Sequence, residues 1–70
     1  MVENRVRAAR RRRGWSQSQL AAIAGIPANT LSTIETGARI PRVDTALRIA
    51  RALDLPVERL FWLAQDIRRG

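Results

Sequence analysis

Arginine supplies most of the chemistry that this chain could do. The 70 residues carry 13 basic side chains, all of them arginine, against six acidic ones, and the formal net charge is +7. Histidine and cysteine are absent, which removes the usual general base, thiol catalysis and disulfides. The acidic residues are scattered, without a nucleophile–base pair or a set of metal ligands. The composition therefore argues against an enzyme and against a metal or cofactor, and favours a polyanionic partner.

Two polyanions fit this charge, nucleic acid and an anionic membrane surface. A helix that lies on a membrane needs a large exposed apolar face, whereas the basic N-terminal segment has a narrow stripe of valine and alanine. No apolar run approaches the roughly 18 residues of a membrane span, and no signal-peptide core follows the N-terminus. We therefore expect a cytoplasmic, nucleoid-associated protein with neither a membrane partner nor a small-molecule ligand.

Hydrophobic periodicity predicts an all-α chain of five short helices. The first helix is expected from Glu3 to Arg13. Val2, Val6 and Ala9 recur there at helical spacing, and the glycine that follows suits a left-handed helix end. The run of four arginines, Arg10 to Arg13, thus falls at the end of this helix, where basic side chains suit the negative end of the helix dipole.

The second helix, Gln17 to Ala24, has the clearest predicted start. Ser16 can cap it, and Gln19 three residues later can complete a capping box. Gly25 is expected to end it, because a positive φ is cheap for glycine. A third helix is expected over about residues 28–36.

The pattern of apolar residues in the C-terminal half predicts two more helices. Apolar residues from Val43 to Leu53 follow a three- and four-residue pattern, and Asp54 is an acceptable stop. The last helix is expected to begin at Pro56. Its expected inward side chains are Val57, Leu60 and Phe61. The alternative is a short C-terminal strand in "LFWLA", residues 60–64.

The residue types of the third helix indicate a site for DNA. Leu31 and Ile34 form its apolar side, and its other side is small and uncharged. That outer side consists of Ala28, Asn29, Ser32, Thr33 and Thr36. A helix with such a thin outer face can enter the ~12 Å major groove without steric or electrostatic penalty. The second and third helices are therefore expected to form a helix-turn-helix.

The complete pattern resembles the Cro/C1-type (XRE) helix-turn-helix family from about Asn4 to Phe61. The resemblance rests on "NRVRAARRRRGWSQSQLA", "AGIPANTLSTIETG" and "PRVDTALRIARALDLPVERLF" in this order. It implies a compact five-helix bundle, one domain over residues 1–70, that binds double-stranded DNA at a palindromic operator as a homodimer and represses transcription. Two alternatives stay open: an antitoxin-like interaction module with secondary DNA binding, and the DNA-binding piece of a larger regulator.

The resemblance also implies roles for single residues. The positions that match the family's base-reading residues are Ala28, Asn29, Thr30 and Thr33. Asn29 is the best candidate, because an amide can pair bidentately with adenine. The positions that match contacts to the DNA backbone are Gln17, Ser18, Thr36, Arg39, Arg42 and Arg10.

At one point the chain departs from the family. Pro27 and Ala28 stand where relatives often have a capping serine and a long base-reading side chain. Direct readout is therefore expected to be sparse, with DNA shape and backbone contacts carrying more of the specificity.

The arginine run is expected to divide into separate roles. The resemblance pairs Arg10 with Glu35 in a structural salt bridge that braces the recognition helix. Arg11 and Arg12 are expected to supply long-range attraction to DNA. Further along, residues 62–70 are expected to form a dimer contact or a tail. The candidate contacts are Trp62 and Leu63, large apolar residues beside an inward face that is already occupied.

Overall fold

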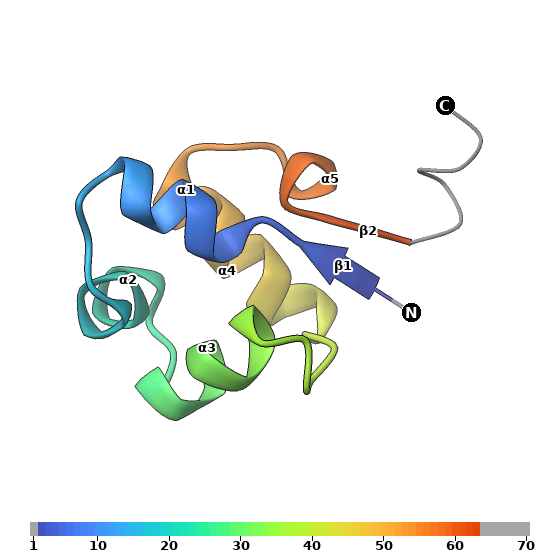
Figure 1. Ribbon diagram of the computed structural model, residues 1–70, viewed down its shortest axis with the longest axis horizontal. Coiled ribbons are helices and arrows are strands. Elements are labelled where there is room, and N and C mark those ends of the chain that lie inside the picture. Colours follow the sequence, from blue (N-terminus) through green and yellow to red (C-terminus); the bar gives the residue numbers. More distant parts are fainter. Residues whose placement is uncertain (1, 64–70) are drawn as a thin grey trace.

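Five helices and a two-stranded sheet make up the described part of the chain (Figure 1). The structure is a computed structural model that describes residues 2–63. In chain order the elements are β1 (Val2–Asn4), α1 (Val6–Arg12), α2 (Gln17–Ala24), α3 (Ala28–Glu35), α4 (Val43–Leu53), α5 (Val57–Leu60) and β2 (Phe61–Leu63). The predicted helical bundle is confirmed, and α2 and α4 have the predicted bounds.

All five helices contribute to one apolar core. Helix α4 crosses the middle of the bundle, where it contacts α1, α2 and α5 (Figure 1). The fully buried large side chains are Val6, Leu20, Leu31, Ile34, Ile49, Leu53 and Leu60. Burying a side chain of this size stabilises the fold by about 1.5–3 kcal/mol. This core therefore fixes the direction in which α3 faces.

Local sequence sets both ends of α2. Ser16 Oγ accepts a hydrogen bond from Gln19 N at 3.1 Å, and Gln19 Oε1 accepts one from Ser16 N at 2.7 Å. This is the predicted capping box, and it satisfies two backbone amides that the helix leaves unpaired. At the other end Gly25 adopts a φ of 74°, which would cost a residue with a Cβ roughly 1–2 kcal/mol. The turn into α3 is therefore specified locally.

Near the N-terminus the structure differs from the predicted helix, Glu3 to Arg13. Residues Val2–Asn4 form strand β1, and α1 begins at Val6. Asn4 Oδ1 accepts a hydrogen bond from Val6 N at 3.1 Å, which satisfies an amide at the start of α1. The spacing of Val2 and Val6 fits a helix, but pairing with a distant strand overrides such local patterns.

After Leu60 the structure distinguishes between the two predicted alternatives, a continued helix and a short strand. Helix α5 ends at Leu60, and Phe61 adopts a φ of −132° and a ψ of 136°, values typical of a strand. The assignment of Phe61 to the last helix is therefore wrong, and the alternative strand is present over Phe61–Leu63 as β2, while residue 64 of the predicted strand lies outside the described residues. Strand β2 pairs antiparallel with β1, with Trp62 opposite Glu3, so the two ends of the described chain lie side by side (Figure 1).

Candidate nucleic-acid interface

Helices α2 and α3 form a helix-turn-helix joined by residues 25–27. Leu31 and Ile34 of α3 are completely buried, whereas Ala28 and Asn29 at its start are exposed. Helix α3 forms the lower edge of the molecule in Figure 1, with α5 at the opposite, upper edge. A helix that is held from one side and open on the other has the form that enters a major groove.

The candidate base-reading residues fall into two pairs. Ala28 and Asn29 are exposed, whereas Thr30 and Thr33 are half-buried. Asn29 Oδ1 accepts a hydrogen bond from Thr30 N at 2.9 Å, and Thr33 Oγ1 donates one to Thr30 O at 2.9 Å. The threonine hydroxyl is thus committed to the helix backbone, while the Asn29 amide group stays available as a donor.

Most of the candidate backbone contacts are exposed. Ser18 lies in the first turn of α2, and Thr36, Arg39 and Arg42 lie in the loop between α3 and α4. Arg42 Nε is 3.7 Å from Asp44 Oδ1, with the two side chains 87% and 62% exposed. An exposed pair of this kind contributes about 0–1 kcal/mol, so it does not hold Arg42 away from a phosphate.

Glu35 joins α1, α2 and α3 at a buried point. Its side chain is fully buried, and Arg10 contacts it twice, from Nε at 2.8 Å and from Nη2 at 3.1 Å. Gln17 Nε2 donates to the same carboxylate at 3.0 Å, and Arg7 Nε lies 3.5 Å away. The ion pair that the resemblance implies is therefore present, and Gln17 belongs to it. We call this group, Arg7, Arg10, Gln17 and Glu35, the α3 brace.

The α3 brace shifts the ionisation of its charged members. Burial raises the pKa of Glu35, but the hydrogen bonds from Arg10 and Gln17, the charge of Arg10 and a hydrogen bond from Arg7 outweigh it, so the pKa is lowered. The hydrogen bond to Glu35 raises the pKa of Arg10 despite its own desolvation. Arg10 is 8% exposed and also donates from Nη1 to Trp15 O at 2.8 Å. Its contacts thus favour the bracing role over the contact to a phosphate.

Asn4 is a positioning residue that the sequence analysis missed. Its Nδ2 donates to Ile34 O at 2.9 Å, in the last turn of α3. Together with the α3 brace, this bond ties the C-terminal end of α3 to β1 and α1. The sequence analysis placed Asn4 inside the first helix, and an asparagine near a helix start is typical of a cap, which does not indicate a contact with a distant carbonyl.

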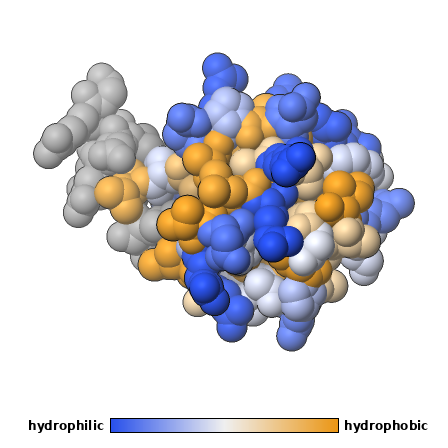
Figure 2. Space-filling model, turned by 180° about the vertical axis from the view of Figure 1, so that it is seen from behind, coloured by the Kyte–Doolittle hydropathy of each residue, from blue (hydrophilic) through white to orange (hydrophobic). Residues whose placement is uncertain are grey.

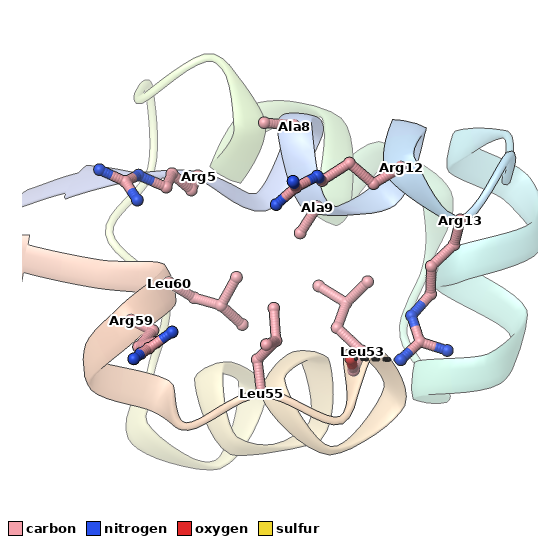
Figure 3. Close-up of a pocket in the computed structure, with 9 residues that line it drawn as sticks. All are labelled: Arg5, Ala8, Ala9, Arg12, Arg13, Leu53, Leu55, Arg59 and Leu60. Carbon is pink, nitrogen blue, oxygen red and sulfur yellow. Dashed lines mark hydrogen bonds between the residues drawn. The ribbon is translucent and has the colours of Figure 1, made fainter.

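The four arginines of the run have different surroundings. Arg11 and Arg12 are exposed. Arg13 Nη2 donates to Leu53 O at 2.8 Å, at the C-terminal end of α4, as Figure 3 shows. The Arg13 guanidinium also lies 5.2 Å from the centre of the Trp15 ring. Half of the run, Arg10 and Arg13, is therefore tied to the fold, and the other half is open to a polyanion.

The two candidate dimer contacts have different surroundings. Trp62 is half-buried, and the Arg5 guanidinium lies 5.1 Å from the centre of its ring. Leu63 is 48% exposed. Within residues 2–63 no group of side chains is arranged to hold a metal ion, and no helix is long and apolar enough to cross a membrane.

The chain is similar in sequence and structure to known proteins of one kind. The profile of the helix-turn-helix family matches residues 6–60. An uncharacterized HTH-type transcriptional regulator of Bacillus subtilis (strain 168), YgzD, is 34% identical over 65 residues, which cover 93% of this chain and 98% of that protein. Another, Rv0023 of Mycobacterium tuberculosis, is 41% identical over 51 residues, 73% of this chain but 20% of that protein. The N-terminal DNA-binding domain of SinR from Bacillus subtilis has a TM-score of 0.72 at 30% identity, covering 76% of this chain and 78% of that one.

Proposed function

The chain belongs to the helix-turn-helix family of DNA-binding transcriptional regulators, and we propose that it binds a palindromic operator as a homodimer and represses transcription. This family is not a class of enzymes. The observation that carries the proposal is α3 itself, which is buried along Leu31 and Ile34 but uncovered at Ala28 and Asn29. The proposal places the protein on the nucleoid, in the cytoplasm.

In this proposal the start of α3 enters the major groove. Asn29 pairs with an adenine through its side-chain amide, and Ala28 offers a methyl group to a thymine. Thr33, whose hydroxyl donates to Thr30 O, contributes mainly its methyl group. These are few and short base-reading side chains, so the sequence-dependent shape of the DNA supplies part of the specificity.

The DNA backbone is held on both sides of α3. The start of α2, with Ser18, faces one phosphate stretch, because helix N-termini and small polar side chains bind phosphate oxygens. The loop after α3 brings Arg39 and Arg42 to another. Both arginines are exposed, so their positive charge reaches the duplex without the cost of breaking buried contacts.

Two copies are proposed because one α3 presents too few base contacts. Each mismatched base pair costs about 1–3 kcal/mol, so a single helix with two exposed residues at its start discriminates weakly among genomic sites. A two-fold dimer repeats these contacts at half-sites about 34 Å apart, one turn of the duplex. Occupation of a promoter by such a dimer would exclude the polymerase.

A second reading has one observation in its favour. The chain spans a fifth of the length of its mycobacterial relatives, so the same domain also occurs as part of larger regulators. Under this reading the DNA contacts are unchanged, and repression or activation depends on the remainder of the protein.

Selection of bound duplexes from a random pool tests the proposal. We expect a palindromic consensus with half-sites about one helical turn apart, and an affinity that falls steeply between 50 and 200 mM salt. The control is a scrambled duplex of the same length and composition, which should bind more weakly. Equal affinity for both duplexes, or binding to anionic vesicles in preference to any duplex, would contradict the proposal.

A further inference from the structure

A hollow of about 270 Å³ lies between α1 and the segment from the end of α4 to α5. It is near the upper edge of the molecule in Figure 1, whereas α3 forms the lower edge. In Figure 2, which views the molecule from behind, hydrophilic side chains project along the same upper edge. The lining residues are Arg5, Ala8, Ala9, Arg12, Arg13, Leu53, Leu55, Arg59 and Leu60. They come from two segments, residues 5–13 and 53–60, which only the fold brings together. We call this space the α1–α5 hollow.

Hydrogen bonds at both ends hold the walls of the α1–α5 hollow in place. At one end Arg5 N donates to Leu60 O at 2.9 Å, which joins the start of α1 to α5. At the other end Arg13 Nη2 donates to Leu53 O at 2.8 Å, which joins the end of α1 to the end of α4 (Figure 3). The walls cannot separate without loss of these bonds. The hollow is therefore preformed, and a ligand does not have to supply the free energy of ordering it.

The inner surface of the α1–α5 hollow is apolar. In Figure 3 the side chains of Leu53, Leu55 and Leu60 point toward α1, and Ala9 points back toward them. Leu53 and Leu60 are each 1% exposed and belong to the core, whereas Leu55 is 37% exposed. The hollow therefore offers a hydrocarbon surface that begins at the solvent and reaches the core.

All the charge in the lining comes from arginine. The four arginines project from both walls and both ends: Arg5, Arg12, Arg13 and Arg59. Within residues 2–63 none of them forms an ion pair with a carboxylate. Arg5 and Arg13 are each held over a tryptophan ring, at 5.1 and 5.2 Å from the ring centre, whereas Arg12 and Arg59 are exposed on opposite walls. Positive charges gathered in this way repel each other, and a bound anion relieves the repulsion.

The side chains of the lining determine which class of ligand fits. Guanidinium groups only donate hydrogen bonds, and the other five lining side chains are alanine and leucine. A hydroxyl or ammonium group of a ligand would therefore lose its hydrogen-bond acceptors on entering, which disfavours sugars, nucleosides and amino acids. The lining favours an acceptor without donors, carried on an aliphatic body. The planar fork of arginine matches a carboxylate in particular.

We propose that the α1–α5 hollow binds a medium-chain fatty acid anion, with the carboxylate between Arg12 and Arg59 and the chain against Ala9, Leu53 and Leu60. A water molecule takes about 30 Å³ in the liquid, and a methylene group is of similar size. The hollow of 270 Å³ therefore holds a chain of about eight carbons with its carboxylate. The site lies at the edge of the molecule opposite α3 and goes beyond the proposed function, on which it does not depend.

Titration of the folded chain with soluble amphiphiles, followed by the amide chemical shifts of the labelled protein, tests the inference. The anionic probes are acetate, hexanoate, octanoate, decanoate and dodecanoate, and octylammonium carries the same chain as octanoate with the opposite charge. Each buried methylene strengthens binding about fourfold. We expect the affinity to rise from acetate to octanoate, with a Kd for octanoate on the order of 0.1–1 mM. It should level off beyond decanoate, when the hollow is full, and octylammonium should not bind.

Replacement of single arginines tests where the carboxylate is held. Arg12→Gln is compared with Arg11→Gln, because these neighbours are both exposed and lose the same charge, but only Arg12 lines the hollow. We expect Arg12→Gln to weaken octanoate binding about tenfold and Arg11→Gln to weaken it by less than about twofold. Arg59→Gln repeats the comparison on the other wall, with Arg51→Gln in α4 as its control. Circular dichroism checks that all four variants remain folded.

Three results would overturn the inference: equal weakening by Arg12→Gln and Arg11→Gln, equal affinity for octanoate and octylammonium, or an affinity that keeps rising to dodecanoate, as for adsorption on an open surface. Vesicles of phosphatidylcholine and phosphatidylglycerol test the other source of an anionic headgroup on an aliphatic chain. Binding to these vesicles without binding to octanoate would also overturn the inference, because the hollow would then not take a free chain. Selective loss of octanoate binding in Arg12→Gln, with unchanged binding in Arg11→Gln, would support it.

Discussion

Replacement of Glu35 by glutamine is the most direct test of how α3 is held. The substitution keeps the shape of the side chain and one acceptor oxygen but removes the negative charge. Glu35 is fully buried and takes hydrogen bonds from Arg10 at 2.8 and 3.1 Å and from Gln17 at 3.0 Å. After the change, the nearly buried guanidinium of Arg10 faces a neutral partner.

The expected loss is large for a chain of this size. Removing one partner of a buried ion pair costs about 3–5 kcal/mol, and the retained oxygen of glutamine places the expected value at the lower end, about 3 kcal/mol. At about 0.05–0.15 kcal/mol per residue, a 70-residue domain has a total stability of roughly 3.5–10 kcal/mol. The variant should therefore lose roughly 30% or more of this stability, and its Tm should fall by roughly 12–24 °C.

Thermal and urea unfolding at pH 7, followed by circular dichroism, measure this loss. Asp44→Asn is the matched control, because it also removes one acidic charge but from an exposed pair with Arg42, and it should cost at most about 1 kcal/mol. Equal losses of free energy of unfolding for the two variants would refute the view that the α3 brace stabilises the fold.

Four further predictions follow, one from the Glu35 ion pair, two from the exposed DNA-facing residues and one from the arginine run. The pKa of Glu35 is lower in the folded state than in the unfolded state. Its ionisation therefore stabilises the fold fully above its unfolded pKa of about 4.3, and this stabilisation is lost as the pH falls through the folded pKa. Unfolding of Glu35→Gln, measured as a function of pH, should lack this loss of stability in acid. Asn29→Ala should reduce the preference for the selected operator over scrambled duplex by about 1–3 kcal/mol, and an unchanged ratio in competition binding would exclude Asn29 as a reader. Arg39→Ala should weaken all duplexes about equally and lower the salt slope by about one, as a titration at several salt concentrations shows. Arg13→Gln should destabilise the fold by about 1 kcal/mol more than Arg11→Gln, since Arg13 alone of the two donates to Leu53 O; equal unfolding midpoints would show that this bond adds nothing.

Structural features that depend on residues close together in the chain could be predicted from the sequence, whereas features that depend on distant residues could not. The capping box of Ser16 and Gln19 and the left-handed Gly25 depend on residues within a few positions of each other, so they could be predicted. Strand β1 could not, because its hydrogen-bonding partner, β2, lies at the other end of the described chain. The same holds for Asn4, whose contact with Ile34 O spans 30 positions.

The candidate site shows the same division. The thin outer side of α3 is a matter of residue type, and Ala28 and Asn29 are exposed as expected. The burial of Glu35 and the engagement of Gln17 with it depend on how α1, α2 and α3 meet. Family resemblance supplied the Arg10–Glu35 pair, whereas no local pattern in the chain indicated that Gln17 would join it.

The sequence by itself determined α2 and α4, the caps of α2 and the excess of arginine over acidic residues, because these depend on residue type and short spacing. It also determined that α3 would have an uncharged outer side. Only the tertiary structure decided which arginines are committed to the fold and which apolar residues remain uncovered. Arg10 and Arg13 are neighbours of Arg11 and Arg12 in the chain, yet only the former meet Glu35 and the end of α4. Val43 and Leu47 share the helical pattern of the core but remain exposed, because burial depends on which elements pack against a helix and not on its periodicity alone.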